Sequence, residues 1–160
     1  MRRALAGAGL AVALAVCGTG AWSYAQARGD DDLAYGRARD AVLSDGRAAV
    51  ARLTTLDAST SARAEAGVRE WKAVTTGPLR AELARESPAA GVSSRGVVTD
   101  AAVTSLDDRA GTAKLIATVR VTSGSAGAER KRLEAVLSRS ADGAWKVKSL
   151  GAVPVTGEQK

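Results

Sequence analysis

The C-terminal half of the chain alternates between apolar and polar positions with a period of two. From Thr112 to Val121 every second residue, beginning at Ala113, is alanine or a larger aliphatic residue, whereas Lys114 and Arg120 fall in the opposite phase. Such alternation predicts a β-strand with one covered and one solvated face. The same pattern and the turn residues between its repeats predict further strands over residues 96–106, 130–140 and 145–153, with turns at 107–111, 123–128 and 142–143.

The region before these strands has a helical period. Apolar residues recur at steps of three and four over residues 33–57, which predicts a first helix that ends near Asp57. Hydroxyl side chains at 59–61 suit the N-cap of a second helix, whose inner face carries Val68 and Trp71.

A third, shorter helix is predicted over residues 78–85. Gly77 suits the left-handed position that ends a helix, and Pro78 suits the first position of the next one. Leu79 and Leu83 face inward from this helix. Three helices followed by four antiparallel strands define an α+β fold, and a curved sheet wrapped on a long helix predicts a cone that could enclose a cavity.

The N-terminal segment, residues 1–27, carries a different signal. After Arg2 and Arg3 the chain is uncharged from Ala4 to Ala27, which exceeds the ~20 residues that cross a bilayer. We predict a single-pass anchor with a cytoplasmic N-terminus, a polar joint at 28–32, an extracytoplasmic domain at 33–153 and a flexible tail at 154–160. The anchor residues are Leu5, Leu10, Leu14 and Trp22, the last at interfacial depth.

Two other interpretations of this segment stay open. Ala25-Gln26-Ala27 has the small-x-small form of a signal-peptide cleavage site. Cys17 could mark a lipoprotein signal, although Val16 stands where glycine or alanine is usual. All three interpretations place the rest of the chain outside the cytoplasm.

Composition and charge exclude several classes of function. The chain has no histidine and one cysteine, which excludes a Ser-His-Asp triad, a histidine-ligated zinc and an intrachain disulfide. Its net charge is +6, but the basic cluster at residues 130–132 lacks interleaved aromatic residues, so a solvated face is favoured over nucleic-acid binding. We expect no cofactor and no metal, because Asp107-Asp108 suits a turn and 30–32 a juxtamembrane charge marker.

Several short motifs, in order along the chain, resemble the Mce-associated membrane proteins of actinobacteria. They are 33–35, 38–42, 53–57 (Leu-Thr-Thr-Leu-Asp), 75–79 (Thr-Thr-Gly-Pro-Leu), 101–103, 109–113 and 142–147. The resemblance implies an NTF2-like, cystatin-like α+β cone on a membrane stalk. It also implies an accessory role in the cell envelope beside Mce-type lipid transport machinery, with transporter subunits as partners.

The candidate cavity wall consists of Trp71, Leu83, Asp100 and Trp145. Asp100 would act as a base if it pointed into an apolar cavity, but a solvent-facing position is favoured. Both tryptophans are favoured as core anchors, with a place in the wall of a lipid-sized pocket as the alternative. No catalytic residue is predicted.

These observations predict a non-enzymatic, membrane-anchored accessory or assembly module. The alternative is an exported binding module that holds a small apolar ligand or a lipid in the cone. Ile116 and Val136 are apolar residues on the otherwise polar outer face of the sheet, which permits pairing of two copies.

Overall fold

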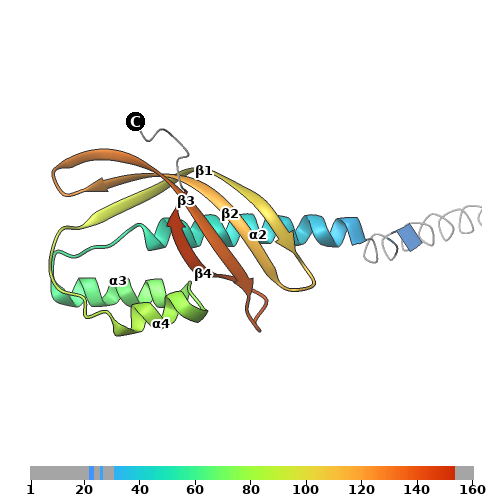
Figure 1. The fold of residues 1–160 in the computed structure, drawn as a ribbon, viewed down its shortest axis with the longest axis horizontal. Helices are drawn as coiled ribbons and strands as arrows, with labels where there is room; N and C mark the ends of the chain where they lie inside the picture. Colours follow the sequence, from blue (N-terminus) through green and yellow to red (C-terminus); the bar gives the residue numbers. More distant parts are fainter. Residues whose placement is uncertain (1–21, 24–25, 27–30, 154–160) are drawn as a thin grey trace, which may run out of the picture. The chain divides into compact units, whose positions relative to one another are not determined.

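The computed structural model describes residues 22–23, 26 and 31–153. In this part of the chain, helices come first and strands follow (Figure 1). The elements are α2 (Asp31–Leu53), α3 (Ser61–Ala73), α4 (Gly77–Arg85), β1 (Ser94–Asp107), β2 (Thr112–Ser123), β3 (Ala126–Arg139) and β4 (Trp145–Ala152). The chain divides into two compact units between Ala38 and Arg39, and the second unit carries the sheet.

The strands form one antiparallel sheet in the order β1-β2-β3-β4, which confirms the α+β class. The sheet is an open meander, with β1 and β4 at its edges. The prediction of a loop over 123–128 was wrong, because β3 begins at Ala126 and pairs there with Ser123. Gly124 makes this tight turn possible with φ 51°, a left-handed conformation that glycine adopts at little cost.

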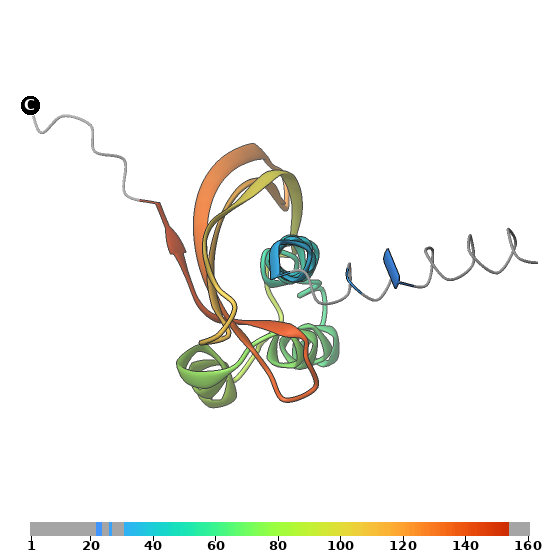
Figure 2. The ribbon, with the colours of Figure 1, turned by 90° about the vertical axis from the view of Figure 1, so that its right-hand side faces the viewer.

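The core lies between the concave face of the sheet and the part of α2 that follows Arg39. Figure 2 shows the strands curving around this part of the helix. Val42 and Val50 of α2 are fully buried, as are Leu115 of β2 and Leu137 of β3. A Cβ atom at Gly46 would lie 2.8 Å from Leu115 Cδ1, so glycine lets the helix approach the sheet closely. The inward phase predicted for β2 is therefore the phase that packs on α2.

The first helix ends at Leu53, four residues before the predicted end. The hydroxyl groups of Thr54 and Thr55 donate back to the carbonyl oxygens of Val50 and Ala51, each at 2.8 Å. Leu56 then leaves the helix and exchanges two backbone hydrogen bonds with Ser94, both 2.8 Å long. The helix stops because the chain turns to extend the edge of the sheet.

The second helix begins as predicted, with Thr60 as its N-cap. Thr60 Oγ1 accepts a hydrogen bond from the Arg63 backbone N–H at 3.3 Å, which satisfies one of the free donors of the first turn. The third helix begins at Gly77, whose φ of 56° is left-handed, and Pro78 follows as predicted.

The connection between α3 and α4 is attached to the far edge of the sheet. Thr75 is completely buried and forms a parallel bridge with Val147 of β4. The Thr76 N–H donates to the Val147 carbonyl oxygen at 2.9 Å, and the Val147 N–H donates to the Val74 carbonyl oxygen at 3.0 Å. The helical pair is therefore joined to both edge strands, to β1 through Leu56 and to β4 through Thr75.

Most of the predicted anchor lies outside the described residues, including Leu5, Leu10 and Leu14. Trp22 is described, and 70% of its surface is exposed. Among the described residues, no helix combines the length and the apolarity needed to cross a bilayer. The last two residues of the predicted joint at 28–32 are helical, because α2 begins at Asp31. The tail at 154–160 also lies outside the described residues.

Candidate binding groove

An open groove of about 1520 Å³ lies where α2 and α3 meet the beginning of β1. Its apolar lining comes from small residues of the two helices and from aliphatic and aromatic residues around them. These residues are Ala48, Ala51, Leu56, Ala66, Gly67, Trp71, Val97 and Val98. We refer to this feature as the groove. It lies at the edge of the sheet, and the cone interior predicted from the sequence is filled by α2.

Two glycines set how closely the walls of the groove approach one another. A Cβ atom at Gly67 of α3 would lie 2.5 Å from Leu56 Cδ1, and one at Gly96 of β1 would lie 1.9 Å from Thr54 Oγ1. The Gly96 N–H also donates to Thr55 Oγ1 at 3.0 Å. The segment after α2 is thus held between α3 and β1 with no room for a side chain at either glycine.

Trp71 joins the two helices that form the groove. Its indole Nε1–H donates to the carbonyl oxygens of Arg52 at 2.7 Å and of Thr55 at 3.0 Å. The same side chain lines a smaller pocket of about 440 Å³ on the other side, together with Leu133 of β3 and Leu150 of β4. Trp71 therefore lines both the groove and the smaller pocket.

Arginines outnumber acids around the groove. Its lining includes Arg47 and Arg52 of α2, Arg63 of α3 and Arg95 of β1, against two acids, Asp57 and Glu70. Arg63 Nη1 lies 2.7 Å from Asp57 Oδ2. In the described part of the chain, no ion pair involves any of the other three arginines.

Asp57 is held in its ionised form by a set of donors. The Ser59 hydroxyl donates to Asp57 Oδ1 at 2.7 Å and the Ser59 N–H at 3.0 Å, while Arg63 binds the other oxygen. The Ser59 hydroxyl, followed by Arg63, holds the pKa of this carboxyl well below its usual range, because both favour the charged form. A carboxylate that resists protonation in this way is poorly suited to general-base catalysis.

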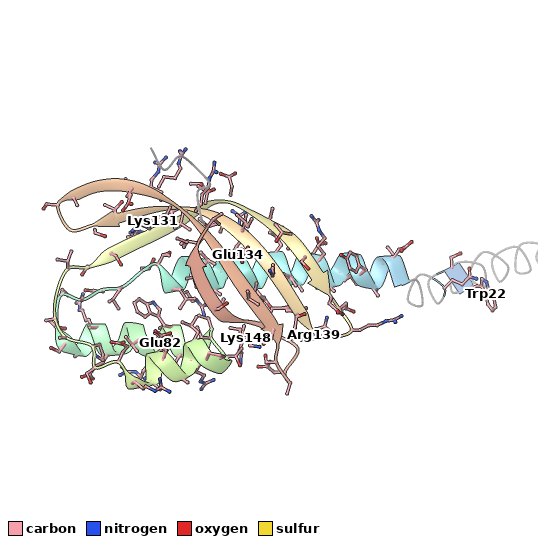
Figure 3. The ribbon with its side chains drawn as sticks, in the orientation of Figure 1. Trp22, Glu82, Lys131, Glu134, Arg139 and Lys148 are labelled. Atoms are coloured by element: carbon pink, nitrogen blue, oxygen red, sulfur yellow. The ribbon has the colours of Figure 1, made fainter. Side chains whose placement is uncertain are left out.

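The other predicted wall residues lie away from the groove. Trp145 is 4% exposed and belongs to the core, where the guanidinium carbon of Arg139 lies 4.9 Å from the centre of its ring. Figure 3 shows Arg139 at the end of β3. Leu83 is half-buried on α4. Asp100 is exposed on β1, opposite Thr118 of β2. Of the four residues, the groove contains Trp71.

The Asp142-Gly143 turn is built by hydrogen bonds within a few residues. The Asp142 carboxylate accepts from the Ser140 hydroxyl and from the Ala144 N–H, and it lies 3.4 Å from Lys146 Nζ. The Ser140 hydroxyl is the main cause of the lowered pKa of Asp142. This acid therefore shapes the turn between β3 and β4. The described residues include no cluster of three or more acids or cysteines that could hold a metal ion.

Sequence reasoning did not single out the arginines or the two glycines of the groove. One signal for them was present, namely the small residues Ala48, Ala51, Ala66 and Gly67 on the two facing helices. Small residues leave open space between helices when no larger residue enters from a third element. Alanine also has the highest helix propensity, so alanines within a helix do not by themselves indicate a groove.

The fold and the groove together define a small α+β domain with one antiparallel sheet and an open, largely apolar groove at its β1 edge. Comparisons with protein-family models, with curated proteins and with solved structures give no match for this chain.

Proposed function

We propose that this chain is a non-enzymatic accessory module of the cell envelope whose folded domain binds an apolar molecule in the groove. The groove is the observation that carries this proposal. Its volume of about 1520 Å³ exceeds the range of typical small-molecule sites, and its lining includes three alanines, Leu56, two valines and Trp71 beside polar and charged residues. An open hollow of this size with an apolar surface suits a lipid chain better than a compact polar substrate.

The location and partners in this proposal follow from the sequence. The uncharged segment up to Ala27 serves as a single-pass anchor, with the domain outside the cytoplasm. The resemblance to Mce-associated membrane proteins supports an NTF2-like cone as the finer description of the fold. It also supports subunits of an Mce-type lipid transporter as partners. Beside such a transporter, a lipid-binding groove could hold a lipid or pass it on.

Binding is favoured over catalysis by the chemistry of the groove. The sequence has no histidine, and Asp57 is held as a carboxylate by Ser59 and Arg63. Glu70 is the second acid of the lining, and no cluster of catalytic groups surrounds it there. The proposed activity is therefore to hold or pass on a ligand unchanged.

The proposal is tested by filling the groove. Ala48 is exposed on α2 and lines the groove, whereas Ala84 is equally exposed on α4 outside the lining. Full-length tagged protein is purified from its own membranes, and its bound lipids are measured by native mass spectrometry. We expect lipid adducts on the wild type and on the Ala84→Trp variant. We expect the Ala48→Trp variant to lose them, because its tryptophan fills the groove. A wild type without adducts, or equal adducts on both variants, contradicts the proposal.

The assembly role has its own test. The same purification identifies the proteins that accompany the full-length chain. Enrichment of Mce-type transporter subunits supports the proposed partners, and a protein that comes alone contradicts them. Pairing of two copies through the sheet face that carries Ile116 and Val136 remains a prediction, which chemical cross-linking in membranes would test.

A further inference from the structure

The arrangement of charge around the groove carries information about the head group of its ligand. Asp57 and Arg63 neutralise each other at 2.7 Å, so this pair leaves little net charge. The remaining charged residues of the lining are Arg47, Arg52 and Arg95 against Glu70. The three arginines come from two elements of the lining, α2 and β1.

These arginines have no acid of their own within the described residues. The ion pairs in that part of the chain join Asp57 to Arg63, Glu129 to Lys131, Asp108 to Arg139 and Asp142 to Lys146. All three arginines are exposed, and their combined positive charge beside the apolar surface attracts an anion from solvent. Guanidinium groups also bind carboxylate and phosphate oxygens with two parallel hydrogen bonds.

We infer that the groove selects a long-chain amphiphile with an anionic head group, and specifically a fatty acid. This inference rests on the proposed function, since it names the ligand of the same groove. The apolar chain lies along the surface formed by Ala51, Leu56 and Trp71. The carboxylate is held at the border by the arginines of α2 and β1.

An extended peptide is a poorer occupant of the groove. The edge of β1 at Ser94 is already paired with Leu56, and Gly96 is bonded to Thr55, so no free edge is left there. Beyond it the strand is interrupted by irregularities between Val98 and Asp100 and between Val103 and Ser105. Bulges of this kind prevent regular pairing with a further strand.

The experiment compares two photo-cross-linking probes that differ in the head group alone. Full-length protein in lipid nanodiscs is labelled with a diazirine derivative of palmitic acid or of the matching alcohol, and cross-linked peptides are mapped by mass spectrometry. A diazirine derivative of phosphatidic acid forms a third arm. We expect the fatty acid to label the peptides around 44–57 and 66–71 about tenfold more than the alcohol does.

Paired variants separate the head group from general charge. Arg47→Gln with Arg95→Gln removes two charges from the groove, and Arg69→Gln with Arg80→Gln removes two from exposed positions of α3 and α4 outside its lining. We expect the first pair to lose about tenfold of the fatty-acid labelling, the order expected for two partly solvated charge contacts, and the second pair to retain it.

The outcomes distinguish the inference from the proposed function. Equal labelling of the groove by acid and alcohol overturns the anionic head group but leaves an apolar binding site. Labelling of the groove by none of the three probes contradicts both. Labelling by phosphatidic acid without labelling by palmitic acid overturns the fatty acid in favour of a phospholipid. Equal losses in the two variant pairs show that net charge, and not the groove, is responsible, which also overturns the inference.

Discussion

The Trp71 indole closes the C-terminal end of α2, its Nε1–H donating to the carbonyl oxygen of Arg52 at 2.7 Å. The last carbonyl groups of a helix have no partner within the helix, and here the Arg52 oxygen accepts from the Thr55 N–H at 3.0 Å as well as from the indole. The indole N–H also reaches the Thr55 carbonyl oxygen at 3.0 Å. One side chain therefore caps a helix, joins α3 to α2 and forms a wall of the groove.

Replacement of Trp71 by phenylalanine separates the donor from the aromatic ring. We expect Trp71→Phe to lower the free energy of unfolding by about 0.5–1.5 kcal/mol, because the carbonyl oxygens of Arg52 and Thr55 lose the indole donor while the apolar wall is partly retained. Urea unfolding of the full-length protein, followed by circular dichroism, measures this. Trp22→Phe is the control, since Trp22 is 70% exposed, and it should leave the unfolding curve unchanged. Unaltered stability of Trp71→Phe would show that the hydrogen bond contributes nothing.

Gly96 is required by the close approach of the segment after α2. A Cβ atom there would lie 1.9 Å from Thr54 Oγ1 and 3.1 Å from the Thr54 carbonyl oxygen. We expect Gly96→Ala to destabilise the fold by about 1–3 kcal/mol through overpacking. Gly127→Ala on β3 is the matched control, because its Cβ would meet nothing within 4 Å, and it should be neutral or slightly stabilising. Thermal unfolding of both variants decides the matter, and similar midpoints would disprove the steric argument.

Asp57 should contribute to the pH dependence of stability. Its pKa is lower in the folded chain than in the unfolded chain, because Ser59 and Arg63 favour the carboxylate. The folded chain therefore binds this proton more weakly. The stabilisation is fully present above the unfolded-state pKa of about 3.9 and is lost as the pH falls towards the folded-state value.

The substitution Asp57→Asn removes that contribution. We expect the variant to be less stable than the wild type near neutral pH and to lose less stability on acidification below about pH 4. Urea unfolding at a series of acidic pH values measures both effects. Asp100→Asn is the control, as Asp100 is exposed and makes no ion pair with any described residue. If the wild type and Asp57→Asn lost the same free energy of unfolding on acidification, Asp57 would not contribute to the pH dependence of stability.

Neighbouring residues of β2 test the two faces of the sheet. Leu115 is fully buried against α2, whereas Ile116 lies in the outer phase and is half-buried. We expect Leu115→Ala to cost about 2–5 kcal/mol, since it leaves a cavity in the core, and Ile116→Ala to cost clearly less. Chemical denaturation of the two variants gives the comparison. A larger cost for Ile116→Ala would mean that the outer face is covered, as in a pair of two copies.

The sequence predicts the sheet well because its signal is local. Alternation along residues 112–121 determines which face is covered, and the glycine of the 142–143 turn determines where the next hairpin lies. The prediction for the β2–β3 hairpin was wrong because its signal is not local. Residues 126–129 are small or charged and lack the strand pattern, yet they pair with β2 because the tight turn at Gly124 directs them there. Tertiary pairing here overrides local preference.

The groove could not be predicted in the same way, since it depends on contacts between distant segments. The 53–57 motif ends α2 and then pairs with Ser94, and the 75–79 motif attaches the helices to Val147. Both motifs were noted from the sequence, but their partners are far away in the chain. Trp71 was predicted as a candidate wall residue, and it lines the groove. What it contacts is the end of α2, which no periodicity reveals.

The bridge between Thr75 and Val147 has a consequence for the order in which the molecule is made. Val147 lies in β4, which follows the other described strands in the chain, and until it is synthesised the α3–α4 pair has no β4 to attach to. The contacts of α3 and α4 with β4 therefore cannot form while the intervening strands are being synthesised. During this time Thr75 and the apolar face of α4 are exposed to water. A growing chain in this interval is the form most open to proteases and most dependent on a chaperone. A chain whose synthesis stops before Trp145 would lack β4, and its α3–α4 connection could not pair with the edge of the sheet.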